Sequence, residues 1–300
     1  MARLDEEKLK DPENKDEATI SAAALSPKLP LVAELSNNTS CFLNKTDQTI
    51  SHLSRILSTP SGTDSLLLTI CYTSLLTSTI LTSISLARLR NTVRILINKA
   101  LTLPPETTFV LTMKTIPSSR LLNLSMRLKA LSSLVSDVRI FSRLWGLITI
   151  WTWAKSAFKE NPNEDWALNQ LEKSQVIASI GYQFLENHAY LSSKGILGWS
   201  KKKQEKAWVW SSRFWALYVM LEFIRLWREK RVREEKGKYK INEKSQWISD
   251  WEKRVLINTV YAPLTVHWSL EKGLISDFFV GLLGSTVGMI KMRQVWNKTE

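Results

Sequence analysis

Residues that could do catalytic or metal chemistry are few in this sequence, and they stand far apart. The three histidines are His52, His188 and His267, and none has a second metal-ligating residue at helical spacing. Glu186 stands two positions before His188, so on a helix the two side chains point to different faces. The sequence contains no glycine-rich phosphate loop, nucleophile elbow or paired-carboxylate motif. We therefore expect a protein that is not an enzyme and that binds no cofactor or metal.

Two parts of the chain are strongly basic, and tryptophans accompany them. The net charge is +13; residues 88–145 carry ten Lys or Arg against two acidic residues, and residues 201–254 carry sixteen against eight. All thirteen Trp lie at or after Trp145, around apolar segments, which is typical of chains at a membrane–water interface. Basic blocks bind either nucleic acid or anionic lipid headgroups, and no nucleic-acid-binding motif accompanies these. We therefore expect an anionic phospholipid membrane as the partner, and no nucleic acid.

Long helices must position these residues. Only ten Gly and nine Pro occur, and most of them separate long apolar stretches that lack strict alternation of apolar and polar residues. This pattern predicts an all-α fold, a membrane-associated helical bundle. We expect a flexible tail over residues 1–29, whose charged clusters leave little to bury, and a single helical membrane domain over residues 30–297. A charged linker is predicted within that domain at residues 228–244.

The stretch from Ser119 to Trp145 contains no helix breaker and predicts an amphipathic helix at the membrane interface. One face is apolar, and a narrow basic flank, which would meet the phosphates, lies opposite and consists of Ser125, Lys129, Ser132, Ser136, Arg139 and Arg143. Arg120 and Arg127 interrupt the apolar side, and an ordinary core helix with a solvated basic edge is the alternative. The membrane-binding residues predicted here are Arg120, Leu121, Leu124, Arg127, Leu128, Lys129, Leu131, Val135, Val138, Arg139, Arg143 and Trp145.

Two apolar segments are candidates for a membrane span. Residues 66–87 contain no charged residue, but many of them are Ser or Thr, whose hydroxyls gain little from lipid and must bond back to their own backbone. This composition favours a buried bundle helix over a span. Residues 273–290 are the better candidate, because small residues at four-residue spacing let helix backbones approach closely in lipid. A packing helix in a soluble bundle is the alternative. The helix-packing residues predicted in this GxxxG helix are Gly281, Gly284, Ser285 and Gly288.

The segment Phe184 to Leu197 reads Phe-Leu-Glu-Asn-His-Ala-Tyr-Leu-Ser-Ser-Lys-Gly-Ile-Leu and resembles the central signature of the peroxin-11 family. Taken by itself, it indicates a helix C-terminus, with Lys194 in the last turn and Gly195 as its cap. The stretch Asp64 to Tyr72 is similar to the early segment of fungal members, particularly the peroxin-11C group. The basic amphipathic helix, the Lys-rich middle and the glycine-containing C-terminus follow in the family's order, so the resemblance covers roughly residues 60–297.

This resemblance implies a peroxisomal membrane protein that forms homo-oligomers, elongates the membrane and promotes peroxisome fission and proliferation. It also implies two kinds of partner, namely the import receptor for peroxisomal membrane proteins and the organelle fission machinery. By analogy, the helix from Ser119 to Trp145 would wedge into the cytosolic leaflet. Two alternatives remain, a solute channel lined by the hydroxyl-rich residues 66–87 and a soluble helical scaffold that binds acidic partners through residues 201–254.

Overall fold

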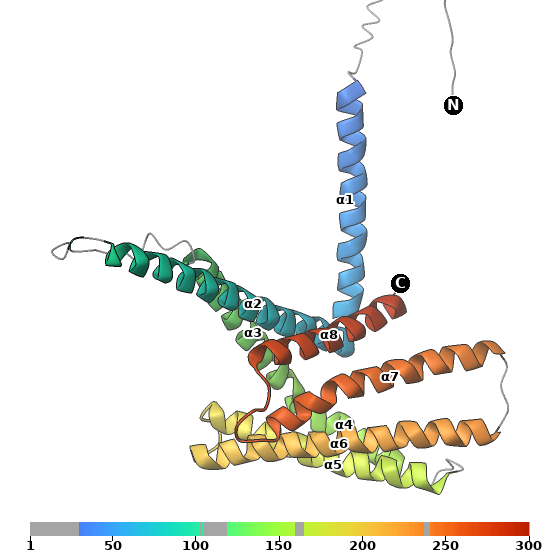
Figure 1. Cartoon of the computed structure of the whole chain (residues 1–300). Coiled ribbons are helices and arrows are strands. Elements are labelled where there is room, and N and C mark those ends of the chain that lie inside the picture. Colours follow the sequence, from blue (N-terminus) through green and yellow to red (C-terminus); the bar gives the residue numbers. More distant parts are fainter. Residues whose placement is uncertain (1–29, 103, 105–118, 160–164, 237–240, 300) are drawn as a thin grey trace, which may run out of the picture. The chain divides into compact units, whose positions relative to one another are not determined.

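The computed structural model of the chain describes residues 30–102, 104, 119–159, 165–236 and 241–299. Every regular element within these ranges is a helix, so the predicted all-α fold is confirmed (Figure 1). The chain divides into two compact units, residues 1–51 and 52–300. The tail predicted over residues 1–29 lies outside the described residues.

Helix α1 comprises Pro30–Leu57 and helix α2 comprises Pro60–Leu101. The chain turns between them at Thr59, whose Oγ1 accepts a hydrogen bond from the Gly62 amide at 3.1 Å. Thr59 is therefore the N-cap of α2, and Pro60 occupies the first turn, where its missing N–H leaves no bond unmade. This cap fixes the start of a helix whose 42 residues extend about 63 Å.

Helix α3, Ser119–Ser142, packs on α2 in antiparallel orientation. The contacts between the two helices repeat every seven residues along both of them. A seven-residue repeat keeps the same face of each helix in contact over several turns. The interface is therefore continuous, and it is made of small or paired polar side chains. The repeating pairs are Asp64 with Arg139, Cys71 with Ser132, and Ser78 with Ser125.

Helix α8, Asp277–Thr299, also packs on α2 (Figure 1). Glycines bring the two backbones together. A Cβ atom added at Gly281 would lie 2.9 Å from Leu76 Cα, and one added at Gly288 would lie 2.9 Å from Thr69 Cα. The contact therefore has no room for a side chain at either glycine. The four residues predicted for helix packing, Gly281, Gly284, Ser285 and Gly288, are all buried.

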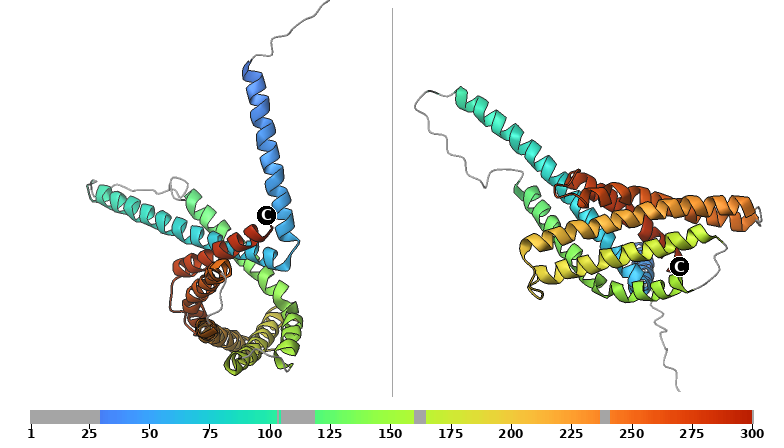
Figure 2. Two further views of the ribbon diagram at one scale, coloured as in Figure 1. Left: turned by 90° about the vertical axis from the view of Figure 1, so that its right-hand side faces the viewer. Right: turned by 90° about the horizontal axis from the view of Figure 1, so that it is seen from below.

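Helices α4 to α7 form a second group, in which α5 packs on α4 and α6, and α6 packs on α7 (Figure 2). A buried polar cluster joins α5, α6 and α7. Glu222 of α6 accepts hydrogen bonds from Gln175 Nε2 and Arg254 Nη2, each at 2.7 Å. This cluster fixes which side of α6 faces the protein. The bounds are Gly146–Phe158 for α4, Trp166–Ser193 for α5, Lys201–Lys236 for α6 and Ile241–Trp268 for α7, and the 3₁₀ turn η2, Arg143–Trp145, joins α3 to α4.

The prediction of a linker at residues 228–244 is wrong for most of that segment. Helix α6 continues to Lys236, and α7 begins at Ile241; residues 237–240 between them lie outside the described residues. Residues 228–236 are helical, and aromatic and acidic side chains contact several of their cations. Arg231 stacks over the Trp227 ring one turn earlier, at 4.8 Å from the ring centroid.

The α8–α2 contact gives a first prediction. Replacing Gly288 by Val would push a side chain into the backbone of Thr69, so α8 would have to move away from α2. We expect the free energy of unfolding to fall by about 1–3 kcal/mol or more, measured by denaturant titration in detergent micelles. Gly198→Val is the matched control, because no atom lies within 4 Å of a Cβ added there. An unchanged transition in the Gly288 variant would contradict the close approach of the helices.

The start of α5 gives a prediction about pH. Asp165 is the N-cap and accepts from the Ala167 and Leu168 amides at 2.9 and 3.2 Å, and from Arg228 Nη2 at 2.7 Å. Hydrogen bonding from Arg228, which outweighs the opposing effect of burial, lowers the pKa of Asp165 below its usual value. A carboxyl whose folded pKa is depressed stabilises the protein above its unfolded pKa of about 4, and that contribution disappears as the pH falls through the folded value.

Asp165→Asn keeps an oxygen that can cap the helix but removes the charge. We expect the variant to be less stable than the parent by a constant amount above pH about 5, and the difference to shrink toward zero at lower pH. Thermal unfolding followed by circular dichroism across this range measures the difference. A gap that is independent of pH would show that the ionised carboxylate contributes nothing.

Candidate lipid-facing surface

Burial on α3 is the reverse of what packing in water requires. The buried polar residues are Ser125, Ser132 and Arg139, whereas Leu134 and Phe141 are 62% and 55% exposed. A helix of a water-soluble protein buries its Leu and Phe and exposes its Ser and Arg. In lipid the reverse arrangement is favourable, because small side chains bring helices together and hydrocarbon solvates the large ones. The outer face of α3 is therefore suited to lipid.

Most of the buried hydroxyls of α2 and α3 have partners within the protein, with Ser85 Oγ as an exception. Ser78 Oγ lies 3.2 Å from Ser125 Oγ, and either hydroxyl can instead donate to the carbonyl oxygen of the other residue, at 3.0 or 2.9 Å. Along α2, threonine hydroxyls bond the carbonyl four residues earlier, as at Thr69 and Thr73. Hydroxyls that bond in this way need no water, so they do not exclude the helix from a bilayer.

By length and composition, α2 is the one helix among the described residues that is long and apolar enough to cross a membrane. Only 17% of its apolar window is buried, whereas a core helix of a soluble protein would be mostly buried. The predicted ranking, with residues 273–290 as the better span and residues 66–87 as a buried bundle helix, is therefore wrong. The reason is that several α2 hydroxyls, such as those of Thr69, Thr73 and Thr77, are bonded to their own backbone, whereas α8 begins only at Asp277 and ends in basic turns.

Exposed charges on α3 lie near its N-terminal end. Arg120, Arg127 and Lys129 are exposed, and no charged residue from 130 to 142 is. Lys129 Nζ lies 3.1 Å from Asp277 Oδ2, which neutralises the acidic residue that opens α8. Because α3 runs antiparallel to α2, its basic end lies beside the later part of α2. The α2–α3 pair is therefore more basic at that end, whereas the basic last turns of α8 lie at the start of α2, because Gly281 and Gly288 lie against Leu76 and Thr69.

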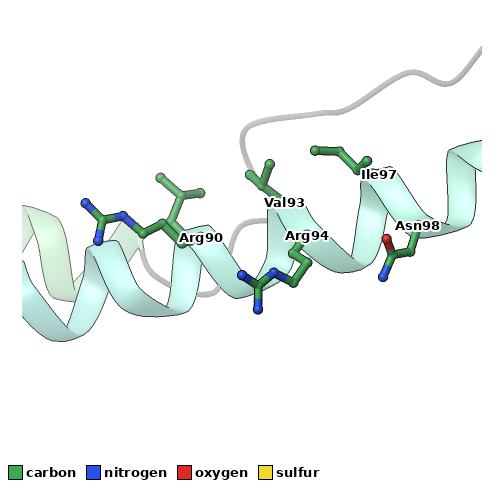
Figure 3. Close-up of a pocket in the computed structure, with 6 residues that line it drawn as sticks. Arg90, Val93, Arg94, Ile97 and Asn98 are labelled. Atoms are coloured by element: carbon green, nitrogen blue, oxygen red, sulfur yellow. The ribbon is translucent and has the colours of Figure 1, made fainter.

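The last turns of α2 are amphipathic. Arg90, Arg94 and Asn98 follow one another at four-residue spacing along one side of the helix, and Val93 and Ile97 follow along another (Figure 3). Together they line a shallow concavity of ≈ 390 Å³. Val93 and Ile97 are 44% and 54% exposed. An exposed helix with separate basic and apolar stripes suits the headgroup region of a bilayer.

The structure distributes the residues predicted for membrane binding between the outside and the inside of the protein. Arg139 pairs with Asp64 at 2.9 Å, and Arg143 pairs with Glu186 at 2.9 Å, so these two cations have partners within the chain. A role in lipid binding stays a prediction for the whole set. Exposed are Arg120, Leu124, Arg127, Lys129, Leu131, Val138 and Trp145; Leu121, Leu128 and Arg143 are partly buried, and Val135 and Arg139 are buried.

Side chains of α5 hold the break between α3 and α4. At the 3₁₀ turn, Gln183 Nε2 donates to the Arg143 carbonyl at 2.9 Å, and Asn187 Nδ2 donates to the Leu144 carbonyl at 3.0 Å. The Arg143 guanidinium forms two bonds to the Glu186 carboxylate, at 2.9 and 3.2 Å. Backbone carbonyls freed where a helix breaks need such partners when they are buried. These three residues of α5 therefore fix the direction in which α4 leaves the end of α3.

Glu186 is almost fully buried, and Tyr182 OH donates to its Oε1 at 3.0 Å. Burial raises the pKa of Tyr182, and the nearby Glu186 carboxylate raises it further, so the phenol stays a neutral donor. Sequence reasoning missed this role of Glu186. The available signal was the spacing of Gln183, Glu186 and Asn187, which places three polar side chains on one face of a helix that is otherwise rich in apolar residues.

The end of α5 is as predicted. Gly195 has φ +77, the left-handed region that favours glycine, and the Ile196 amide donates to the Leu191 carbonyl at 2.9 Å. Gly195 is therefore the helix cap. Lys194, which directly follows the helix, pairs with Asp137 of α3 at 2.9 Å. The end of α5 is thus tied to the outer part of α3.

The three histidines serve structural contacts. His52 Nε2 lies 2.8 Å from Thr299 Oγ1, His188 Nδ1 lies 2.8 Å from a main-chain carbonyl one turn earlier, and His267 Nδ1 accepts from the Ile275 amide at 3.1 Å. Within the described ranges, no group of three or more His, Cys, Asp or Glu is placed to hold a metal ion. The surfaces of the protein are therefore the candidates for its functional site.

Comparison with known proteins assigns the chain to a family. The family model for peroxisomal biogenesis factor 11 (PEX11) matches residues 118–296, which is more than half of the chain. The chain belongs to the PEX11 family. An uncharacterized protein of Schizosaccharomyces pombe is 29% identical over 166 residues, which cover 55% of this chain and 74% of that relative. No solved structure matches the chain.

The family resemblance predicted from Phe184 to Leu197 is confirmed, and with it a role in peroxisome biogenesis. The PEX11 match includes α3, the break at η2 and the α5 side chains that hold it, as well as most of α8. It begins after α2, so the segment Asp64 to Tyr72 lies outside it. Assignment to the fungal peroxin-11C group stays a prediction.

The α3–α4 break gives a testable difference between two ion pairs. Glu186→Ala would leave the Arg143 guanidinium buried without its carboxylate, and we expect unfolding to become about 3–5 kcal/mol easier. Asp137→Ala is the control, because it removes a pair with Lys194 in which both side chains are nearly half exposed, at a cost of less than about 1 kcal/mol. Denaturant titration in detergent measures both. Equal losses would show that Glu186 holds nothing in place.

Proposed function

We propose that this PEX11 family member inserts α2, α3 and α8 into the peroxisomal membrane and elongates that membrane, which promotes peroxisome fission and proliferation. The observation that carries the proposal is the reversed burial on these helices. Serines and glycines fill the contacts between them, while side chains such as Leu134 of α3, Phe279 of α8 and Ile84 of α2 face outward at 62%, 51% and 40% exposure. In water, such a surface would be unfavourable at roughly 25 cal/mol for every Å² of apolar area left exposed.

The polarity of the α2–α3 pair supports insertion from one side of the bilayer. The uncharged residues 66–87 of α2 extend about 33 Å, which matches a hydrocarbon core of about 30 Å. Arg90 and Arg94 follow on α2, and Arg120 of α3 lies nearest to them, level with residue 83 of α2, whereas Arg127 lies level with residue 76. Each cation near an anionic lipid surface contributes on the order of 1 kcal/mol. The end of α2 that carries Arg90 and Arg94 therefore remains at the headgroups while the uncharged stretch of α2 enters the hydrocarbon.

Membrane elongation follows from this asymmetry. Because α2 enters with its basic end at one surface, its amphipathic last turns and the start of α3 occupy more area in that leaflet. An excess of area in one leaflet favours curvature, and interfacial helices are sensitive to it. Self-association would concentrate the effect. Homo-oligomers, an import receptor for peroxisomal membrane proteins and the organelle fission machinery are therefore the partners that this proposal requires.

The structure gives little support to a solute channel. A channel would need the hydroxyl-rich stretch of α2 to line a polar path, but hydroxyls such as those of Thr69 and Thr73 bond their own backbone. Ser78 faces Ser125 across a helix contact instead of a cavity. Membrane elongation is accordingly the function that we propose for this chain.

Charges placed on the outer face of α3 test insertion. Leu134→Lys and Phe141→Lys change exposed positions, so a water-soluble protein would accept both. If these positions face hydrocarbon, each charge opposes insertion by about 2.5–3.5 kcal/mol near the bilayer centre. We expect the double variant to be extracted from membranes by alkaline carbonate, and peroxisomes that carry only this variant to be fewer and rounder.

Ile196→Lys is the matched control, because it changes a residue that is 68% exposed but lies in the turn after α5. It should leave both extraction and organelle shape as in the parent. Full resistance of the α3 double variant to carbonate, with normal peroxisome number, would overturn the proposal.

A further inference from the structure

Helix α6 carries a narrow apolar stripe on its outer face. Between residues 207 and 227, every exposed residue lies on this stripe, at alternating spacings of three and four positions. Such spacing keeps side chains in one line along a helix. The stripe consists of Trp210, Arg213, Leu217, Met220, Ile224 and Trp227, of which Met220 and Trp227 are both 56% exposed.

Both ends of the stripe have the same composition. The Arg213 guanidinium lies 4.8 Å from the centre of the Trp210 ring, and that of Arg231 lies 4.8 Å from the centre of the Trp227 ring. An arginine on an indole leaves its outward N–H groups available to an anion while the ring remains in an apolar environment. From Trp210 to Trp227 the helix rises about 26 Å. Amphipathic ends therefore enclose an apolar middle.

The apolar middle borders a groove between α6 and α7. Leu217 and Met220 of α6 line it together with Val266 of α7, and its volume is ≈ 460 Å³. Val266 is 46% exposed, so the stripe widens onto the neighbouring helix. The lining is apolar apart from Arg213 at one end and Thr265. This composition suits acyl chains or apolar side chains.

Within the described chain, a hydrogen bond from Arg213 Nε to the Ser269 carbonyl, at 3.2 Å, joins the stripe to another element, and the apolar side chains remain exposed. The opposite side of α6 is held by the buried cluster in which Glu222 accepts from Gln175 and Arg254, while Arg225 Nη1 donates to Gln175 Oε1 at 3.1 Å. Rotating α6 to bury the stripe would break these charged hydrogen bonds. The apolar residues therefore face outward by necessity, and something outside the described chain must cover them.

Two occupants fit an exposed stripe of this kind, a second copy of α6 or a membrane surface. Helix α6 carries eleven Lys and Arg against five Glu, so two copies would repel each other. An antiparallel pair that aligned Trp210 with Trp227 of the second copy would also place Lys206 opposite Arg231. The same charges attract an anionic surface, where each cation is stabilised by on the order of 1 kcal/mol. The charge balance selects the membrane.

We infer that the α6 stripe lies against an anionic lipid surface, with Leu217, Met220 and Ile224 among the acyl chains and Arg213 and Arg231 at the phosphates. This second contact rests on the proposed membrane function, but it is separate from the insertion of α2, α3 and α8. It would hold the C-terminal half of the chain flat on the membrane that the first contact enters.

A fluorescent label on the stripe tests the inference in the full chain. Met220→Cys, in a chain that carries Cys41→Ser, is labelled with an environment-sensitive dye, and the protein is reconstituted into phosphatidylcholine vesicles with or without phosphatidylserine. The same chain without Met220→Cys is the blank, and Ser174→Cys, exposed on α5, is the control position. With phosphatidylserine, we expect a nitroxide on the lipid acyl chains to remove most of the emission at position 220 and little at position 174.

Arg213→Glu with Arg231→Glu should abolish this quenching, because both phosphate contacts are reversed in charge. Quenching at position 220 by aqueous iodide but not by the lipid nitroxide would overturn the inference, as would equal quenching in neutral vesicles. Cross-linking of position 220 to the same position of another copy, without lipid quenching, would assign the stripe to self-association and also overturn it. Carbonate extraction of the same vesicles reports the insertion of α2, α3 and α8 independently.

Discussion

The antiparallel contact between α2 and α3 is the constraint on which the rest of the structure depends. Its seven-residue repeat uses Ser78, Ser125 and Ser132, whose side chains are small enough for the helices to approach closely. Because the serines of α3 face α2, the geometry of the helix places the larger side chains of Leu134 and Phe141 on its outward side. The same reasoning applies to α8, where glycines take the inner positions. A bilayer is the solvent in which this division is favourable.

The break between α3 and α4 connects this assembly to the remaining helices. A helix that left α3 without interruption would carry the apolar face onward, whereas the 3₁₀ turn redirects the chain. Gln183, Glu186 and Asn187 supply the hydrogen bonds that the turn needs, and all three lie in or beside the segment that resembles the family signature. The part of the sequence that resembles the family signature is thus the part that holds the turn between α3 and α4.

The sequence was sufficient to predict the all-helical fold and the Gly195 cap, because each follows from local backbone preferences or from a short spacing. It was not sufficient to predict which side of α3 faces inward. Ser125 and Ser132 are polar in water, and on a helical wheel they read as a headgroup-facing flank. Against α2 the same residues act as small side chains. A single sequence does not say which property decides, since that depends on a neighbour some fifty residues earlier in the chain.

The two surfaces differ in how they balance charge, and this difference indicates different roles in the membrane. On α3, the buried Arg139 forms an ion pair with the partly exposed Asp64, which compensates for the loss of water around the guanidinium. Arg139 therefore adds no charge to the outer face of α3. On α6, Arg213 and Arg231 stay at the surface, stacked on indoles, where they remain able to bind phosphate. The first arrangement suits depth in the bilayer, and the second suits position along its surface. The bonds of Glu186 at the α3–α4 break join α3 to α5, on which α6 packs. Under the two proposals above, a tilt of α2, α3 and α8 in the membrane would be transmitted through this joint to α6, which is about 54 Å long. That rigid coupling, more than the insertion of any one helix, is what would allow this chain to impose a shape on a membrane.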